Sequence, residues 1–246
     1  MIMKTNDAYT FPVKFEDVHY IASLYTANSE KVNTLLNGTG LKAGLHFLGK
    51  PTVALGLIKY KKSDLGTYNE IILSIPVVQH HEQTRWTSWI DLYADFKKRK
   101  GGQYIIHIPV TTQVSVDAGR TLWGYPKTLL PIIHNFESGG INTLLLNEEN
   151  KPLINVNGKT GFEIPIPAMP LMTYSFLNNT LLKTTVNVSC RMKCKMKSGL
   201  TIQVADPDHP IGKTIRELGI ENKNPIFTIE SKHFKARFNK GQIIVQ

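Results

Sequence analysis

Residues 186–197, VNVSCRMKCKMK, alternate between apolar and polar side chains without a break. This period of two is typical of a β-strand that buries one face and exposes the other. It places Cys190 and Cys194 on the buried face as small apolar side chains, and it places the basic residues, Lys195 among them, on the solvated face. We therefore expect a chain built mainly from antiparallel strands.

The rest of the sequence extends this pattern. Strand-like segments cover residues 53–60, 68–78, 103–110, 141–146, 153–156, 162–166, 200–204 and 225–238. Capping residues and terminating glycines predict helices over residues 29–36, 88–101 and 208–218, with Ser29, Ser88 and Asp208 as the caps. The sequence thus predicts a mainly antiparallel β fold, α+β at the margin, with a few short helices.

Composition limits the class of protein. The chain has 246 residues, 41% of them apolar and 20% charged, which excludes a disordered or fibrous protein. Because no linker or repeat divides it, we expect one domain over residues 1–246. The sequence contains neither an apolar run of the ~20 residues needed to cross a bilayer nor an export signal. With two cysteines only, these features predict a cytoplasmic protein without a membrane partner.

The net charge is +10, from 29 Lys and Arg against 19 Asp and Glu, and it favours anionic partners. The basic residues form separate groups at residues 59–62, 97–100 and 191–197 and match no nucleic-acid-binding signature. We therefore expect no nucleic-acid partner. Small carboxylates remain compatible with the charge.

Common motifs for metals and cofactors are absent from the sequence. His81-Glu82 lacks the second histidine of the zinc motif H-E-x-x-H, and there is no P-loop and no G-x-S-x-G elbow. Residues 206–209 offer oxygen and nitrogen atoms, but their place before a helix is better explained by capping. We expect neither a metal nor an organic cofactor.

The unusual segment is VDAGRTLWGYPKT, residues 116–128. Asp117 can cap a short helical turn, Gly124 can end it, and Pro126 fixes the backbone immediately before Lys127. Apolar and aromatic residues lie on both sides of this lysine. An amine with the ordinary pKa of ~10.4 is almost fully protonated at neutral pH, whereas burial favours the neutral, nucleophilic form. The residues alone therefore allow either a lysine that reaches solvent or a desolvated nucleophile.

The block AGRTLWGYPKT, residues 118–128, resembles the signature A-G-R-x-x-x-G/A-Y/F-P-K of the acetoacetate decarboxylase family, whose lysine forms a Schiff base with a keto acid. Lys127 falls on that lysine. Residues 64–70, DLGTYNE, look like the family's L-G-x-Y-x-E segment, so Glu70 matches the glutamate near the lysine. The likeness implies a cone-shaped antiparallel β-barrel with a flanking sheet around an apolar pocket, in a homo-oligomer.

The resemblance also implies a function. Acetoacetate decarboxylase is itself a known example of a lysine activated by its surroundings, so Lys127 is expected to attack the ketone of a small β-keto acid such as acetoacetate and release carbon dioxide. Glu70 is expected to act as the acid or base. Trp123 and Tyr125 are expected to line the substrate site. Arg120 either binds the substrate carboxylate or braces its own loop.

Three departures keep other functions open. Thr128 stands where the decarboxylases carry a second lysine, and Val18-His19-Tyr20 contains no arginine where the family has one. Residues 53–57, VALGL, contain no acidic residue where the family carries a further one before the L-G-x-Y-x-E segment. Residues 79–101 look longer than their family counterpart and are expected to reshape the mouth of the pocket. The alternatives are a Schiff-base aldolase or dehydratase of the same fold, acting on another keto acid, and a non-catalytic barrel that binds a small molecule.

Overall fold

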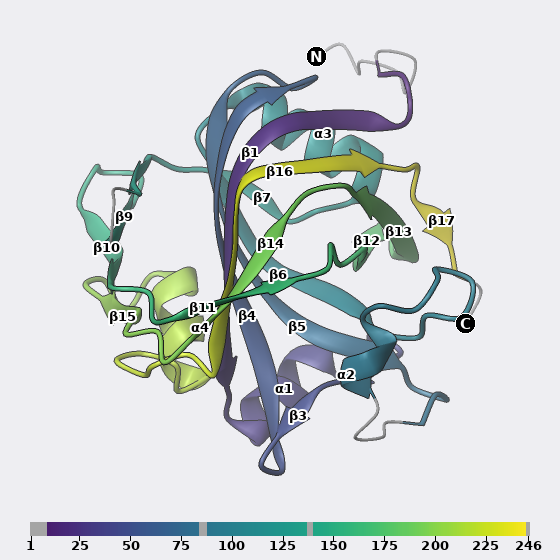
Figure 1. The fold of residues 1–246 in the computed structure, drawn as a ribbon, viewed down its shortest axis with the longest axis horizontal. Coiled ribbons are helices and arrows are strands. Elements are labelled where there is room, and N and C mark those ends of the chain that lie inside the picture. Colours follow the sequence, from purple (N-terminus) through teal and green to yellow (C-terminus); the bar gives the residue numbers. More distant parts are fainter. Residues whose placement is uncertain (1–8, 84–87, 137–139, 245–246) are drawn as a thin grey trace.

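The computed structural model of the protein describes residues 9–83, 88–136 and 140–244, and a closed β-barrel is its main feature (Figure 1). Each barrel strand pairs with the next, and the last pairs with the first. All neighbours are antiparallel except β6 and β12, which run parallel. In order around the barrel, the strands are β16 (Phe227–Phe238), β1 (Val13–Thr26), β4 (Lys50–Ser63), β5 (Tyr68–Gln79), β6 (Gly102–Val110), β12 (Leu171–Leu177) and β13 (Thr180–Val188).

A second, smaller sheet lies beside the barrel, on the left in Figure 1. Its strands, in order, are β15 (Thr201–Val204), β10 (Pro152–Gly158), β9 (Ile141–Leu146) and β8 (Ile132–Asn135). Short strands extend the main sheet: β2 (Leu41–Ala43), β3 (His46–Phe47), β7 (Lys127–Leu129), β11 (Glu163–Ile166), β14 (Met192–Met196) and β17 (Gln242–Ile243).

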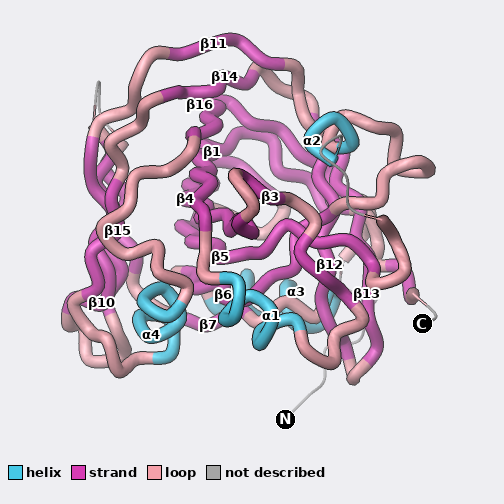
Figure 2. Tube along the Cα trace, turned by 90° about the horizontal axis from the view of Figure 1, so that it is seen from below, coloured by secondary structure: helices cyan, strands magenta, loops and turns pink. Residues whose placement is uncertain are grey.

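The helices are α1 (Ser29–Leu36), α2 (Ser88–Asp91), α3 (Gln113–Trp123) and α4 (Pro210–Glu217). Figure 1 shows α3 at the upper end of the barrel and α1 and α2 at the lower end. Figure 2 looks toward that lower end, where α2 lies at the rim of the ring of strands. Within the described ranges, no helix combines the length and apolar character needed to span a membrane.

Alternation along each strand produces two cores. On β5, Glu70, Ile72 and Ser74 face the inside of the barrel, whereas Ile71 and Leu73 are buried in the core that packs against the small sheet. The inner core and the outer core therefore share the same strands, and polar groups on the inner face are presented to the barrel interior.

The structure confirms the mainly antiparallel β fold and corrects its details. The alternating segment 186–197 is not one strand: it is interrupted between β13 and β14, and each half pairs with a different part of β16. Lys195 is buried rather than solvated, because its amine lies 2.5 Å from the Glu230 carboxylate and 3.0 Å from the Thr160 hydroxyl. Cys190 and Cys194 are free thiols at half-buried positions.

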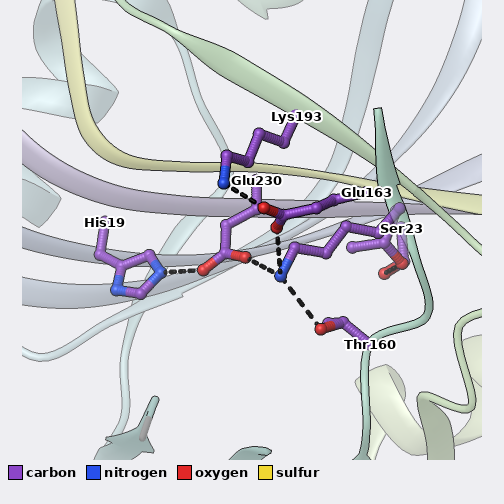
Figure 3. A network of polar contacts seen from close by, with 8 residues as sticks. His19, Ser23, Thr160, Glu163, Lys193 and Glu230 are labelled. Carbon is purple, nitrogen blue, oxygen red and sulfur yellow. Dashed lines mark hydrogen bonds and ion pairs between the residues drawn. The ribbon is translucent and has the colours of Figure 1, made fainter. Parts of the chain in front are cut away.

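Figure 3 shows the network around Glu230, with the His19 ring on one side of the carboxylate. The amine of Lys195 contacts the other carboxylate oxygen. The His19 Nε2 atom lies 2.7 Å from Glu230 Oε1. Burial alone would raise the pKa of Glu230, but the hydrogen bonds from His19 and Lys195 lower it to about 2. The outer face of the barrel wall thus holds a buried, ionised network separate from the barrel interior.

The helix predictions were accurate in place but not in every boundary or cap. Asn28, not Ser29, caps α1 through its side-chain oxygen, and His209, not Asp208, caps α4. Of residues 88–101, only Ser88–Asp91 are helical, and the side chain of the predicted cap Ser88 lies outside the described part. The short turn expected around Asp117 is the eleven-residue helix α3, whose N-cap is Thr112.

Candidate active site

The turn after α3 aims Lys127 into the barrel. Gly124 ends the helix with a left-handed backbone, φ 65°, and its N–H donates to the Arg120 carbonyl. A side chain on Gly124 would also collide with the backbone of Phe176, so both the left-handed backbone and this close approach require glycine. After Pro126 the chain reverses, and Lys127 begins β7, parallel to β6 and in register with Ile108.

Gly119 of α3 leaves the space through which the lysine side chain passes. A methyl group added at Gly119 would lie 2.5 Å from Cδ and 2.6 Å from Cε of Lys127. Because ordinary carbon contacts start at about 3.5 Å, only glycine admits the lysine in this path. Four residues earlier on the same helix face, Ser115 Oγ lies 2.8 Å from Lys127 Nζ and accepts a hydrogen bond from it.

The lysine amine and the Glu70 carboxylate form a buried pair. Lys127 Nζ donates to Glu70 Oε2 at 2.6 Å, and only 4% of Lys127 and 2% of Glu70 are exposed. The other carboxylate oxygen, Oε1, accepts a hydrogen bond from the Tyr60 hydroxyl at 2.9 Å. The Tyr68 ring lies below the amine, 5.5 Å from Nζ to the ring centroid, and stacks on Tyr60. The pair therefore has hydrogen-bonded partners while lying out of bulk water.

The tyrosines around the pair remain neutral. Burial, with a further contribution from the Glu70 charge, holds the pKa of Tyr60 and of Tyr68 well above the usual value. Burial likewise raises the pKa of Tyr125. A proton can pass between Lys127 Nζ and Glu70 Oε2 along one short hydrogen bond, and the transfer leaves a neutral amine beside a carboxylic acid.

The pair faces a cavity of about 150 Å³ inside the barrel. Most of its lining is apolar, which keeps an amine poorly solvated. Residues that line it come from every barrel strand and include Val18, Ala22, Ala54, Gly56, Ile58, Ile72, Ile105, Ile108, Leu171, Val186, Phe227, Ile229 and Phe234. Among the described residues there is no cluster of three or more His, Cys, Asp or Glu side chains that could hold a metal ion.

The other predicted site residues divide into two groups. Trp123 and Tyr125 line the cavity and stack on one another, with ring centroids 5.7 Å apart. Contact of either residue with a substrate stays a prediction. Arg120 lies outside the lining, and its Nε and Nη2 atoms donate to the Lys127 carbonyl oxygen at 2.9 and 2.6 Å. We therefore propose that Arg120 braces its own loop and does not bind the substrate carboxylate.

Sequence reasoning singled out Lys127 and Glu70, which the structure brings together, and missed Tyr60, Ser115 and Gly119. Signals for two of these were present. Ser115 and Gly119 are four residues apart and therefore share one face of a helix that precedes the lysine. Tyr60 is directly opposite Tyr68 in the β4–β5 pairing, a register that depends on the turn at residues 64–67, which the sequence reasoning did not use.

Comparison with known proteins identifies the family. The profile of the family described as acetoacetate decarboxylase (ADC) matches residues 2–177. The chain belongs to the acetoacetate decarboxylase family. Among curated proteins, none matches the sequence.

Several solved structures share the fold at low identity. An acetoacetate decarboxylase from Legionella pneumophila is 15% identical with a TM-score of 0.73, over 100% of this chain and 92% of that one. An acetoacetate decarboxylase-like enzyme from Sphingomonas wittichii RW1 is 12% identical with a TM-score of 0.63, over 100% and 98%. The enduracididine biosynthesis enzyme MppR, complexed with the condensation product of pyruvate and imidazole 4-carboxaldehyde, is 11% identical with a TM-score of 0.64, over 96% and 90%.

Proposed function

We propose that this family member is a Schiff-base lyase that decarboxylates a β-keto acid, with Lys127 as the nucleophile. The observation that carries the proposal is the buried Lys127–Glu70 pair, 2.6 Å between Nζ and Oε2, at the wall of an apolar cavity. A neutral amine is needed for attack, and the adjacent carboxylate provides a place for the proton that the amine must lose.

The steps follow from these groups. Glu70 takes a proton from Lys127, and the free amine adds to the ketone carbon of the substrate. Loss of water, with protons returned by Glu70, gives a protonated imine. The bond to the carboxylate then breaks, carbon dioxide leaves, and the electron pair passes to the imine to form an enamine. Protonation of the enamine carbon and hydrolysis release the ketone and restore Lys127.

The surroundings favour the loss of carbon dioxide. The apolar lining solvates a carboxylate poorly, whereas the neutral carbon dioxide that forms from it needs no such solvation. Ser115 and the Tyr68 ring hold the amine in place through the contacts described above. No organic cofactor is required for these steps, since the imine itself accepts the electron pair.

A second candidate uses the same imine for aldol or dehydration chemistry on another keto acid. The observation in its favour is Thr128, which stands where the decarboxylases carry a second lysine. The complex of MppR with a condensation product of pyruvate shows that a protein of this fold binds such a compound. Cytoplasmic residence, homo-oligomer assembly and a one-domain chain stay predictions from the sequence.

Chemical trapping tests the proposal. We would incubate the protein with acetoacetate, pyruvate and longer β-keto acids, reduce with borohydride and locate the adduct by peptide mass. We expect an adduct on Lys127 that Lys127→Met abolishes, with carbon dioxide released from the β-keto acids. Lys195→Met is the matched control, because Lys195 is also a buried lysine paired with a glutamate but lies on the outer face of the barrel.

The outcomes separate the candidates. An adduct without carbon dioxide release would favour aldol or dehydration chemistry. A folded protein that forms no adduct with any carbonyl compound would refute both enzyme functions and favour a binding barrel.

A further inference from the structure

Arg99 lies buried at the end of the barrel cavity that is opposite to Lys127. It follows α2 in the segment between β5 and β6, only 5% of it is exposed, and it lines the cavity together with Trp89, Leu92 and Gln103. Figure 1 shows α2 and α3 at opposite ends of the barrel, and α3 is the helix that contacts Lys127. The two ends of the cavity therefore carry different cations.

Backbone carbonyls fix the Arg99 guanidinium without neutralising it. Its Nε donates to the Gly101 carbonyl at 3.0 Å, and its Nη1 donates to the Pro170 carbonyl. These bonds use two of the five N–H donors of an arginine. Within the described part of the chain, Arg99 forms no ion pair with a carboxylate, although buried charges in proteins are normally paired.

The local charges favour an anion at this end of the cavity. Burial lowers the pKa of Arg99 to about 10, with Tyr174 and Asp91 acting in the opposite direction, so the guanidinium is charged at neutral pH. Burial lowers the pKa of the neighbouring Lys183, and the positive charge of Arg99 lowers it further. A carboxylate bound to Arg99 would supply the missing counter-charge through charge-assisted hydrogen bonds.

Strand geometry sets the separation of the two ends. Glu70 marks the level of the reactive lysine on β5, and Ser74 of the same strand donates a hydrogen bond to Gln103 at the Arg99 end. These two residues are four positions apart along the strand, a separation of roughly 13 Å at about 3.3 Å per residue. Between them, the lining includes the small residues Ala22, Ala54 and Gly56, which leave room for a narrow ligand.

We propose that Arg99 binds a carboxylate at the far end of the substrate, and that the substrate is a keto acid whose carbonyl and anchored carboxylate are separated by an apolar chain. The placement of the substrate carbonyl at Lys127 rests on the function proposed above. For decarboxylation, the substrate is a β-keto acid with a second, remote carboxylate. The carboxylate on the carbon adjacent to the ketone carbon leaves as carbon dioxide, and the remote one stays on Arg99.

Binding of ligands without a ketone tests the anion site by itself. We would measure by calorimetry the affinities of unbranched alkanoates, from hexanoate to dodecanoate, and of the matching primary amides. We expect the longer alkanoates to bind the wild-type protein about 10- to 100-fold more tightly than their amides. Arg99→Gln should remove this difference by weakening the alkanoates only.

The matched control is Lys183→Gln, which removes the neighbouring cation but does not alter the cavity lining. We expect it to change alkanoate affinity by less than about threefold. Equal affinities of alkanoate and amide for the wild-type protein would overturn the proposal, and this comparison needs no variant. Unchanged alkanoate binding in folded Arg99→Gln would overturn it as well.

A second measurement distinguishes failure of this proposal from failure of the proposed function. Borohydride trapping is repeated with methyl ketone carboxylates whose methylene spacer lengthens one carbon at a time. We expect trapping on Lys127 to rise with spacer length to a maximum and the maximum to vanish in Arg99→Gln. Arg99-dependent alkanoate binding without any adduct would refute only the Schiff-base function, whereas an adduct with no dependence on spacer length would refute the remote anchor.

Discussion

Replacing Gly119 with alanine should separate the reactivity of Lys127 from the stability of the fold. The new methyl group would lie 2.5 Å from Cδ and 2.6 Å from Cε of Lys127. Since these methylenes belong to a flexible side chain, the lysine moves while the helix backbone stays. The amine then leaves its place between Glu70 and Ser115.

The magnitude follows from these distances. Restoring an ordinary carbon contact of about 3.5 Å requires a shift of about 1 Å, and a reacting atom misplaced by that much loses about 100-fold in rate. For stability, alanine is favoured over glycine within a helix by about 0.5–1 kcal/mol, whereas overpacking costs about 1–3 kcal/mol. The net loss of unfolding free energy is therefore about 0–2.5 kcal/mol.

The assay combines the rate of borohydride-trapped adduct formation with urea unfolding of the same samples. Gly140→Ala is the control, because a methyl group at Gly140 meets no atom of the described residues within 4 Å. A folded Gly119→Ala protein that forms the adduct at the wild-type rate would show that the lysine does not follow the path described here. Loss of folding instead of loss of rate would equally contradict the reasoning.

Two further predictions concern Arg120 and acid stability. Arg120→Gln should slow adduct formation by the same factor for neutral ketones and for keto acids, because the exposed guanidinium contacts the Lys127 carbonyl and not the cavity. It should also lower the unfolding free energy by about 1 kcal/mol. A loss of rate for keto acids alone would show that Arg120 contacts the substrate carboxylate. Burial lowers the pKa of His107 and of His134 to about 4, so both stay neutral in the fold while the unfolded chain binds protons below pH ~6.5. Stability should therefore fall as the pH drops from about 6.5 to 4, by up to about 1.4 kcal/mol per pH unit for each histidine. Urea midpoints at neutral pH and at pH ~5 check this slope, which His107→Gln should halve, and a flat profile would contradict it.

Much of the fold was predictable because most strands are apolar segments rich in β-branched residues and bounded by turn residues, but β12 and β1 escaped detection. The register of β1 slips between Phe15 and Val18 and again between Val18 and Tyr20, so the inward positions change from odd to even numbers. A bulge of this kind removes the period on which strand detection depends. Lys195 was misplaced for a related reason: its partner Glu230 comes from a strand distant in sequence, and only that partner makes burial of the lysine tolerable.

The site was predictable where the chemistry is local in sequence. The segment around Lys127 sets its own geometry through Gly124 and Pro126, and the motif that contains Glu70 placed the carboxylate near the amine. Arg99 was not singled out, since its position depends on how the segment after α2 returns to the barrel end and finds the carbonyls of Gly101 and Pro170. Such contacts arise from tertiary packing, which produces no periodic pattern or motif in the sequence.

The barrel carries its two cation-bearing ends on two separate chain connections. The connection from β5 to β6 supplies Arg99, whereas the connection that follows β6 supplies α3 and leads to Lys127. Insertions and substitutions in one connection leave the other intact, since both are anchored in the same closed wall of strands. If Arg99 anchors the substrate as proposed, exchange of the connection that carries it should change which molecules are bound while the Lys127 amine keeps its partners Glu70 and Ser115.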